Sequence, residues 1–179
     1  MPVPMSAAKS SPWMAAGRCI SDGALTMAAL AGNSSSAMTM SDTGKRIDSI
    51  IKLGLGDALK SLGFKKQARN FRRIEPDGSI LVINIQSSLY NETGRGVFTV
   101  NLGRYLPDMA REMEREVHDK PKEHECHARI RIGRLLPGIE ADYWWQVDAR
   151  SNLDALAAEL KEAVILHGIA WFESPDSMA

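Results

Sequence analysis

Cysteine is scarce in this sequence, with only Cys19 and Cys126 among 179 residues. So few thiols exclude the disulfide-stapled scaffold of small secreted proteins, and they favour a reducing, cytoplasmic compartment. Long apolar runs are missing as well, because no stretch approaches the roughly 18 apolar residues that a membrane-spanning helix requires. We therefore expect a protein that does not cross a membrane.

A net charge is also missing, since 22 lysines and arginines balance 22 aspartates and glutamates. The field of the whole protein therefore gives no reason to expect nucleic acid or an anionic membrane as a partner. Along the chain the balance is uneven, because residues 41–75 are mainly basic and residues 137–179 mainly acidic. These ends either attract each other or solvate separate faces; alternatively, the basic stretch is a binding surface. In the weakest alternative Arg69, Arg72 and Arg73 bind nucleic acid, with an affinity that falls steeply with salt.

Residues 1–40 have little charge and no periodic apolar pattern. Their only charged residues are Lys9, Arg18 and Asp22, and the last two interrupt the apolar run that a secretory signal needs. We predict a disordered tail over residues 1–40, because too little apolar surface is available to offset chain entropy. An over-extended reading frame, with Met38 or Met40 as the physiological start, is an alternative that we keep open.

Residues 41–179 fit one domain of ordinary size, which begins with a helix. From Thr43 to Leu62, apolar residues recur with the spacing of one helix face. Asp42 or Thr43 can cap this helix, and Gly63 can end it. Because glycine weakens a helix interior, Gly54 and Gly56 predict a close packing contact or a local bend.

Alternating or apolar stretches bounded by turn residues then indicate five strands. We predict them over residues 64–73, 79–89, 96–102, 128–135 and 143–148, with a short exposed helix over 108–117. A final helix begins at Ser151, which can cap it, and ends at Gly168. This order predicts an α+β fold, in which a single antiparallel sheet of about five strands carries the N- and C-terminal helices on one face.

The register of the first long hairpin can be predicted, because a shift of one residue would turn every apolar side chain to the wrong face. We expect Ile83 to pair with Leu102, which keeps the apolar residues of both strands together. The same register places Asn84 opposite Asn101 on the other face.

We expect the last two strands to form a second hairpin, with Ile132 opposite Trp145 and Arg131 opposite Gln146. Trp144 must then point away from Trp145, so it joins the polar side of the sheet. The polar face is the predicted ligand-binding surface. Its residues are Asn84, Gln86, Thr99, Asn101, Arg129, Arg131, Trp144 and Gln146.

Two interpretations of this polar face are open. In the first it is a solvated outer face, on which an arginine covers Trp144 in a cation–π contact. In the second it is concave or partly roofed and recognises a ligand. Buried amides without partners cost about 1–3 kcal/mol each, so a covered face needs water, another side chain or a ligand to satisfy them.

Side chains capable of metal binding or nucleophilic catalysis gather at His118, His124, Cys126 and His127. The His-x-Cys-His spacing matches no usual zinc site, and a second ligand pair is missing. Neighbours along the chain are also poor evidence for a catalytic cysteine–histidine pair. Phosphate-binding loops, the esterase elbow and the zinc-protease helix motif are not found. We therefore predict no catalytic residue, no metal and no cofactor.

Several short stretches, taken in order, resemble the bacterial family called domain of unknown function 4304. They are Leu62–Lys66, Phe71–Arg72, Ile85–Ser87, Phe98–Gly103, Cys126, Arg131–Leu135 and Tyr143–Trp145, and together they cover about residues 43–170. The resemblance implies a domain boundary and a bacterial, cytoplasmic setting. It implies no activity and no catalytic residue.

The leading functional hypothesis is a noncatalytic binding or interaction module that uses the polar sheet face for a protein or a small polar ligand. An immunity or accessory role would suit such a module. The alternative is a hydrolase or nuclease-like enzyme, with Arg129 and Arg131 as anion holders and His124 or His127 as base. A membrane or nucleic acid is not expected as a partner.

Overall fold

A computed structural model describes residues 40–88, 94–139 and 141–177 of the chain. The tail predicted over residues 1–40 lies outside these ranges, apart from Met40, and so does Cys19. Cys126 is a free, buried thiol. Within the described ranges, every helix falls short of the length and apolarity that crossing a bilayer requires.

The N-terminal helical stretch begins earlier than predicted, at Met40, so Asp42 and Thr43 lie within its first turn. It consists of α1 (Met40–Ile51), a π-helical segment (Lys52–Gly56) and α2 (Asp57–Ser61). The close contact predicted at Gly54 is confirmed, because a Cβ there would lie 2.5 Å from the Ala157 carbonyl oxygen. Gly63, at φ +83°, ends the stretch as predicted. Its N–H and that of Phe64 donate to the carbonyls of Lys60 and Leu59, the pattern of a Schellman motif.

The C-terminal helical stretch differs from its prediction at both ends. It comprises α4 (Leu153–Glu162), a π-helical segment (Ala163–Gly168) and α5 (Ile169–Glu173). The cap is Asn152, whose side-chain oxygen accepts from the N–H groups of Asp154 and Ala155; the Ser151 hydroxyl bonds to Asp148 instead. Gly168 does not end the helix, because α5 follows it directly. The glycine lies against the sheet, since a Cβ there would lie 3.3 Å from Leu102.

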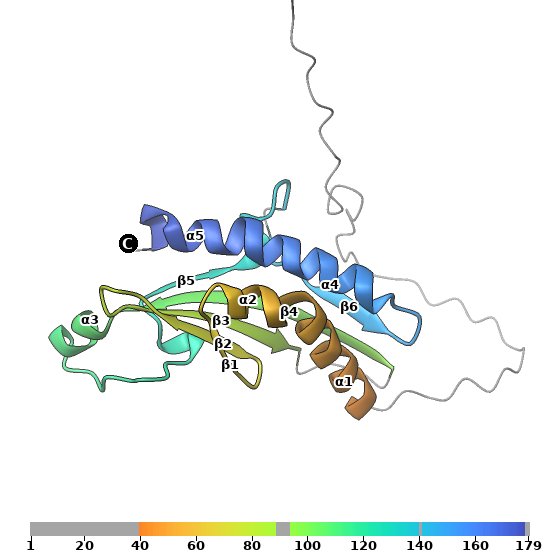
Figure 1. Cartoon of the computed structure of the whole chain (residues 1–179), viewed down its shortest axis with the longest axis horizontal. Helices are drawn as coiled ribbons and strands as arrows, with labels where there is room; N and C mark the ends of the chain where they lie inside the picture. Colours follow the sequence, from red (N-terminus) through yellow and green to blue (C-terminus); the bar gives the residue numbers. More distant parts are fainter. Residues whose placement is uncertain (1–39, 89–93, 140, 178–179) are drawn as a thin grey trace, which may run out of the picture. The chain divides into compact units, whose positions relative to one another are not determined.

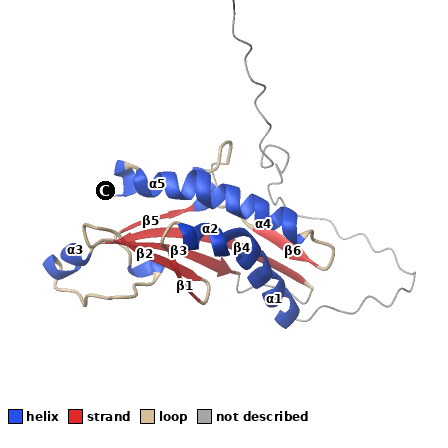
Figure 2. Cartoon of the chain, in the orientation of Figure 1, coloured by secondary structure: helices blue, strands red, loops and turns tan. Residues whose placement is uncertain are grey.

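The prediction of an α+β fold built on a single antiparallel sheet is confirmed. Six strands form the sheet, in the order β1-β2-β3-β4-β5, with β6 also paired to β4. They are β1 (Lys65–Gln67), β2 (Asn70–Ile74), β3 (Ile80–Ser87), β4 (Arg95–Tyr105), β5 (Ala128–Arg131) and β6 (Trp145–Asp148). Figure 1 shows α1, α2, α4 and α5 on one side of the sheet, and Figure 2 separates helices from strands by colour.

The first predicted strand, residues 64–73, is in fact a tight hairpin of β1 and β2. Gln67 pairs with Asn70, so the chain turns at Ala68 and Arg69. Ala68 has a φ of +52°, a left-handed conformation that favours glycine or asparagine. Because neither residue type stands there, the usual sequence signal of a turn is missing.

The predicted register of β3 with β4 is confirmed, with Ile83 opposite Leu102 and Asn84 opposite Asn101. The predicted hairpin of the last two strands is wrong. Residues 101–104 of β4 pair with β5, and residues 95–98 pair with β6, so both short strands lie along the same edge of β4. A 3₁₀ turn (Ile132–Leu135) begins where the fourth predicted strand should continue.

The two faces of the sheet bury different sets of side chains. Toward the helices, Phe98, Val100 and Leu102 of β4 are fully buried, and Phe98 stacks on Trp145 at 5.4 Å between ring centroids. The opposite face carries a smaller apolar cluster at one end of the strands. Its members are Ile80, Val82, Tyr105, Ala110 and Cys126. α3 (Pro107–Glu112) and the 3₁₀ turn at Glu123–Glu125 belong to the segment that closes this end.

Candidate functional site

A row of polar side chains crosses the sheet face that lies opposite the main helices. Paired residues of neighbouring strands share a face, so the register alone defines the row. From β1 to β5 it consists of Gln67, Asn70, Asn84, Asn101 and Arg131. We call these five residues, together with Gln86 on the same face of β3, the amide row.

Hydrogen bonds connect four carboxamides of the amide row. The Asn101 amide nitrogen donates to the Gln86 oxygen at 2.8 Å and to the Asn84 oxygen at 3.3 Å. The Asn84 nitrogen in turn donates to the Asn70 oxygen at 2.8 Å. Asn101 is only 4% exposed, so these bonds satisfy an amide that would otherwise be costly to bury. Neighbouring side chains are therefore what satisfies the covered part of this face.

Arg131 ends the row beside two residues of the segment that precedes β6. Its guanidinium forms an ion pair with Asp142 and lies over the Trp144 ring, 5.6 Å from the centroid. Trp144 therefore stands on the polar side, as predicted, and it carries the cation–π contact that the solvated-face interpretation expects. Arg131, Asp142 and Trp144 are all partly exposed, so they form an accessible end of the row.

The remaining three predicted site residues lie on the same face but outside the hydrogen-bonded row. Thr99 is fully buried, and its hydroxyl donates to the Tyr143 carbonyl at 2.8 Å. Arg129 and Gln146 are exposed and oppose Gly103 and Val97 of β4, respectively. Six residues of strand separate these two positions by about 20 Å, so Arg129 and Gln146 cannot touch the same small ligand.

Both arginines that the enzyme alternative requires are already paired with carboxylates. Arg129 lies 3.0 Å from Glu123 and also donates to the His124 carbonyl, while Arg131 pairs with Asp142. Opposite Arg131, therefore, a substrate anion would have to compete with a carboxylate of the protein itself.

The cysteine–histidine cluster has a structural arrangement. Burial raises the pKa of the Cys126 thiol to about 12, and Glu123 adds to the effect, so the thiol stays protonated at neutral pH. The Nδ1 atom of His127 accepts the Leu106 N–H at 3.0 Å, and its ring lies against Tyr105. In the described part of the chain, no three His, Cys, Asp or Glu side chains converge as a metal site would require.

Gln67, Asn70 and Asp142 are members of this site that the sequence analysis missed. Gln67 and Asn70 were missed because residues 64–73 were interpreted as one edge strand, and no register with the following strand was predicted. Once the turn at Ala68 is known, the alternation of β2 places Asn70 beside Asn84. No sequence pattern indicates Asp142, because its position depends on the path of the loop before β6.

The fold and the row together define a class of protein: a small α+β domain that presents a hydrogen-bonded set of carboxamides on the face of its antiparallel sheet. Residues 55–174, which make up more than half of the chain, match the model of the family described as Domain of unknown function (DUF4304). The chain therefore belongs to the DUF4304 family, as its resemblance implied. No curated protein and no solved structure matches it.

Proposed function

We propose that this domain is a noncatalytic binding module whose amide row recognises a protein or a small polar ligand. The observation that carries the proposal is the alignment of Asn84, Asn101 and Arg131 at directly paired positions on one sheet face. A hydrogen bond joins Asn101 to Asn84, and Arg131 stands next to Asn101 in register. Sites that bind polar ligands rely on a few convergent polar groups held by rigid elements.

The direction of the hydrogen bonds indicates what such a ligand offers. The bonds within the row use the side-chain oxygens of Asn70, Asn84 and Gln86 as acceptors. The amide nitrogens of Asn70 and Gln86 are then left as donors, and Gln86 is exposed. A ligand rich in carbonyl or hydroxyl oxygens, such as a peptide backbone or a small polar metabolite, matches these donors.

Trp144 adds a flat apolar surface at the Arg131 end of the row. The arginine–tryptophan contact holds the indole in place, and a fixed aromatic ring contributes binding energy at a low entropic cost. Arginine and tryptophan are also the residue types that most often dominate protein interfaces. This end is therefore the proposed anchor point for a partner.

We place this activity in a bacterial cytoplasm, where the domain would serve as an immunity or accessory protein. The small number of cysteines supports a reducing compartment. The protonated thiol of Cys126 and the paired states of Arg129 and Arg131 support a role in binding rather than in catalysis.

A comparative pull-down from the native cytoplasm tests the proposal. The baits are the wild-type domain, the double variant Asn101→Ala, Arg131→Ala and the double variant Gln86→Ala, Arg131→Ala, which leaves the buried Asn101 in place. The matched control is Lys52→Ala, Lys161→Ala, since both lysines are exposed on the helical layer. Thermal melting of each bait shows whether it is folded.

We expect a partner or a metabolite that the wild type and the lysine control retain, and that both row variants lose about tenfold or more. Retention by folded row variants would contradict the proposal. So would turnover of ester, phosphoester or nucleic-acid substrates by the wild type that His127→Ala abolishes.

A further inference from the structure

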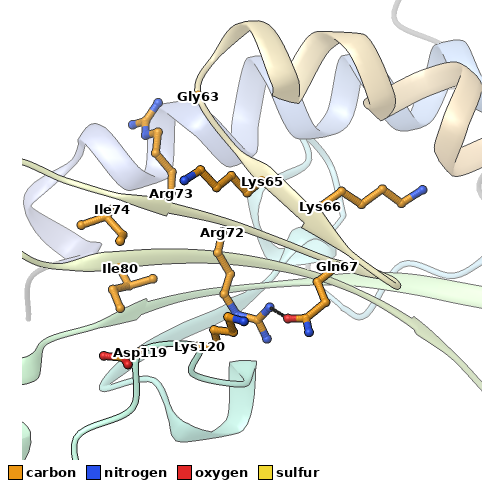
Figure 3. Close-up of a pocket in the computed structure, with 10 residues that line it drawn as sticks. All are labelled: Gly63, Lys65, Lys66, Gln67, Arg72, Arg73, Ile74, Ile80, Asp119 and Lys120. Carbon is orange, nitrogen blue, oxygen red and sulfur yellow. Dashed lines mark hydrogen bonds between the residues drawn. The ribbon is translucent and has the colours of Figure 1, made fainter.

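A pocket of about 700 Å³ lies at the edge of the sheet formed by β1 and β2 (Figure 3). Its lining consists of Gly63, Lys65, Lys66, Gln67, Arg72, Arg73, Ile74, Ile80, Asp119 and Lys120. Five of these ten residues are basic, and Asp119 is the one acidic side chain among them. No aromatic ring lines the pocket. Its volume lies within the range of sites that hold a ligand or an anchoring side chain.

The basic side chains of the pocket fall into two groups. Arg72 and Arg73 are held in place, because Arg72 donates to the Pro121 carbonyl at 2.7 Å and Arg73 donates to Leu62 and Glu75. Lys65 and Lys120 are exposed, and neither forms an ion pair with any residue in the described ranges. The pocket thus combines positioned guanidinium groups with ammonium groups that have no carboxylate partner.

A gap in the strand pairing forms the centre of the pocket. β1 begins at Lys65, opposite Arg72, so β2 continues through Arg73 and Ile74 with no strand of the described residues paired on that side. The Arg73 side chain contacts the Leu62 carbonyl and the Phe64 ring, which leaves Ile74 as the open position of the edge. Figure 3 shows the chain leaving the sheet through Gly63 toward α2 at this point. Ile74 is 70% exposed here, although the neighbouring Ile80 is buried. An exposed strand edge, an aliphatic side chain and a basic rim therefore meet in one place.

We propose that this pocket binds an extended, acidic segment of a partner protein, at a site that shares only Gln67 with the amide row. Carboxylates of the segment would face Lys65, Lys120 and Arg72, and its aliphatic side chains would cover Ile74. Its backbone would continue the line of β1 beside β2, which is how peptides add to an open sheet edge. A nucleic acid fits less well, because single strands bind through aromatic stacking platforms, and the pocket has none.

Fluorescence anisotropy with three labelled peptides tests this proposal on the whole chain. In the first peptide, glutamate and leucine alternate; in the second, lysine replaces glutamate; in the third, serine replaces leucine. We expect the first peptide to bind and to weaken as salt is added, because salt screens the exposed charges. The lysine peptide should not bind, and the serine peptide should bind about tenfold more weakly.

Two variants with matched controls locate the site. Lys65→Glu, Lys120→Glu should weaken the glutamate–leucine peptide by about tenfold or more, because two attractions become repulsions. Lys52→Glu, Lys161→Glu makes the same change in net charge on the helical layer and should leave binding unchanged. Ile74→Ser should weaken the glutamate–leucine peptide but not the glutamate–serine peptide. Circular dichroism checks that each variant is folded.

Three outcomes would overturn the proposal. The first is that the glutamate–leucine peptide does not bind at millimolar concentration. The second is that the two lysine reversals lose peptide affinity equally. The third is that single-stranded DNA or phosphate displaces the labelled peptide at a lower concentration than unlabelled peptide does. The variant Asn101→Ala, Arg131→Ala should bind the peptide like the wild type. A failure at this pocket is therefore distinguishable from a failure of the amide row.

Discussion

The two faces of the sheet are equally close-packed near the centre of β4 but differ in what holds them. On the helix side, Phe98, Val100 and Leu102 are fully buried among apolar side chains. On the other side, Thr99 and Asn101 are almost as buried, yet the Thr99 hydroxyl and the Asn101 amide nitrogen donate hydrogen bonds. Apolar contacts tolerate small changes of geometry, whereas buried hydrogen bonds require particular partners at particular distances. One face therefore supplies most of the stability, and the other specifies and displays a fixed arrangement of polar groups.

The largest loss of stability is expected from a substitution on the helix face of the sheet. Phe98→Ala should lower the free energy of unfolding by about 3–5 kcal/mol, because it removes the ring that stacks on Trp145 and leaves a cavity. On the polar face, Gln86→Ala should lower it by only about 0.5–1.5 kcal/mol, since the Asn101 amide keeps its bond to Asn84. Urea denaturation followed by circular dichroism measures both. Equal losses would show that the faces do not divide stability in this way.

An intermediate loss of stability is expected at the end of the polar face that the small apolar cluster covers. A Cβ at Gly103 would lie 2.7 Å from Cys126 Sγ, so Gly103→Ala should lower the free energy of unfolding by about 1–3 kcal/mol. Adding Cys126→Ala should relieve only the sulfur part of this clash, because the Cys126 Cβ, 2.8 Å from the same position, remains.

The matched control for Gly103 is Gly56→Ala, because a Cβ at Gly56 meets nothing within 4 Å. We expect this change to leave stability unchanged or to raise it by up to about 1 kcal/mol, since alanine favours a helix. A loss at Gly56 as large as that at Gly103 would rule out the steric explanation. Thermal melting of the single and double variants provides the comparison.

The smallest expected effect is a pH dependence at the closed end of the polar face. Burial and the nearby Arg115 charge lower the pKa of His127 below its ordinary value of 6.5. The unfolded chain therefore takes up the proton first, and the His127 contribution to stability is present above pH 6.5 and lost as the pH falls through the folded pKa. Protonation at Nδ1 would also break the bond from the Leu106 N–H.

The substitution His127→Asn isolates this titration, because its amide oxygen can still accept the Leu106 N–H but does not titrate. We expect the difference in melting temperature between about pH 7.5 and pH 5 to be smaller in His127→Asn than in the wild type. The exposed His124 provides the control His124→Asn, which should melt like the wild type at both values. An unchanged pH dependence in His127→Asn would contradict the assignment.

Local patterns were sufficient for much of this architecture. The register of β3 with β4 was predictable because both strands alternate and a short loop joins them, so a shift would expose Ile83 or Leu102. That register also placed Asn84 opposite Asn101, which is the centre of the candidate site. Gly63 was recognisable as a helix end because glycine readily adopts its positive φ.

The error in the partners of β5 and β6 arises because their pairing is not local. Alternation shows which residues of β5 and β6 share a face, but it does not show which strand they pair with. β4, from Arg95 to Tyr105, is long enough to pair with both, one at each end of the same edge. At Ala68 the turn has no glycine or asparagine, so tertiary context and not local preference holds its backbone.

Residue types and their spacing were thus enough to specify the fold class, the central hairpin and the polar character of one sheet face. Packing in three dimensions added what those patterns do not contain. It set the partners of β5 and β6, extended the amide row through Asn70 to Gln67, and created the basic pocket beside Ile74. Periodicity is a property of one segment, whereas these features depend on which segments contact one another.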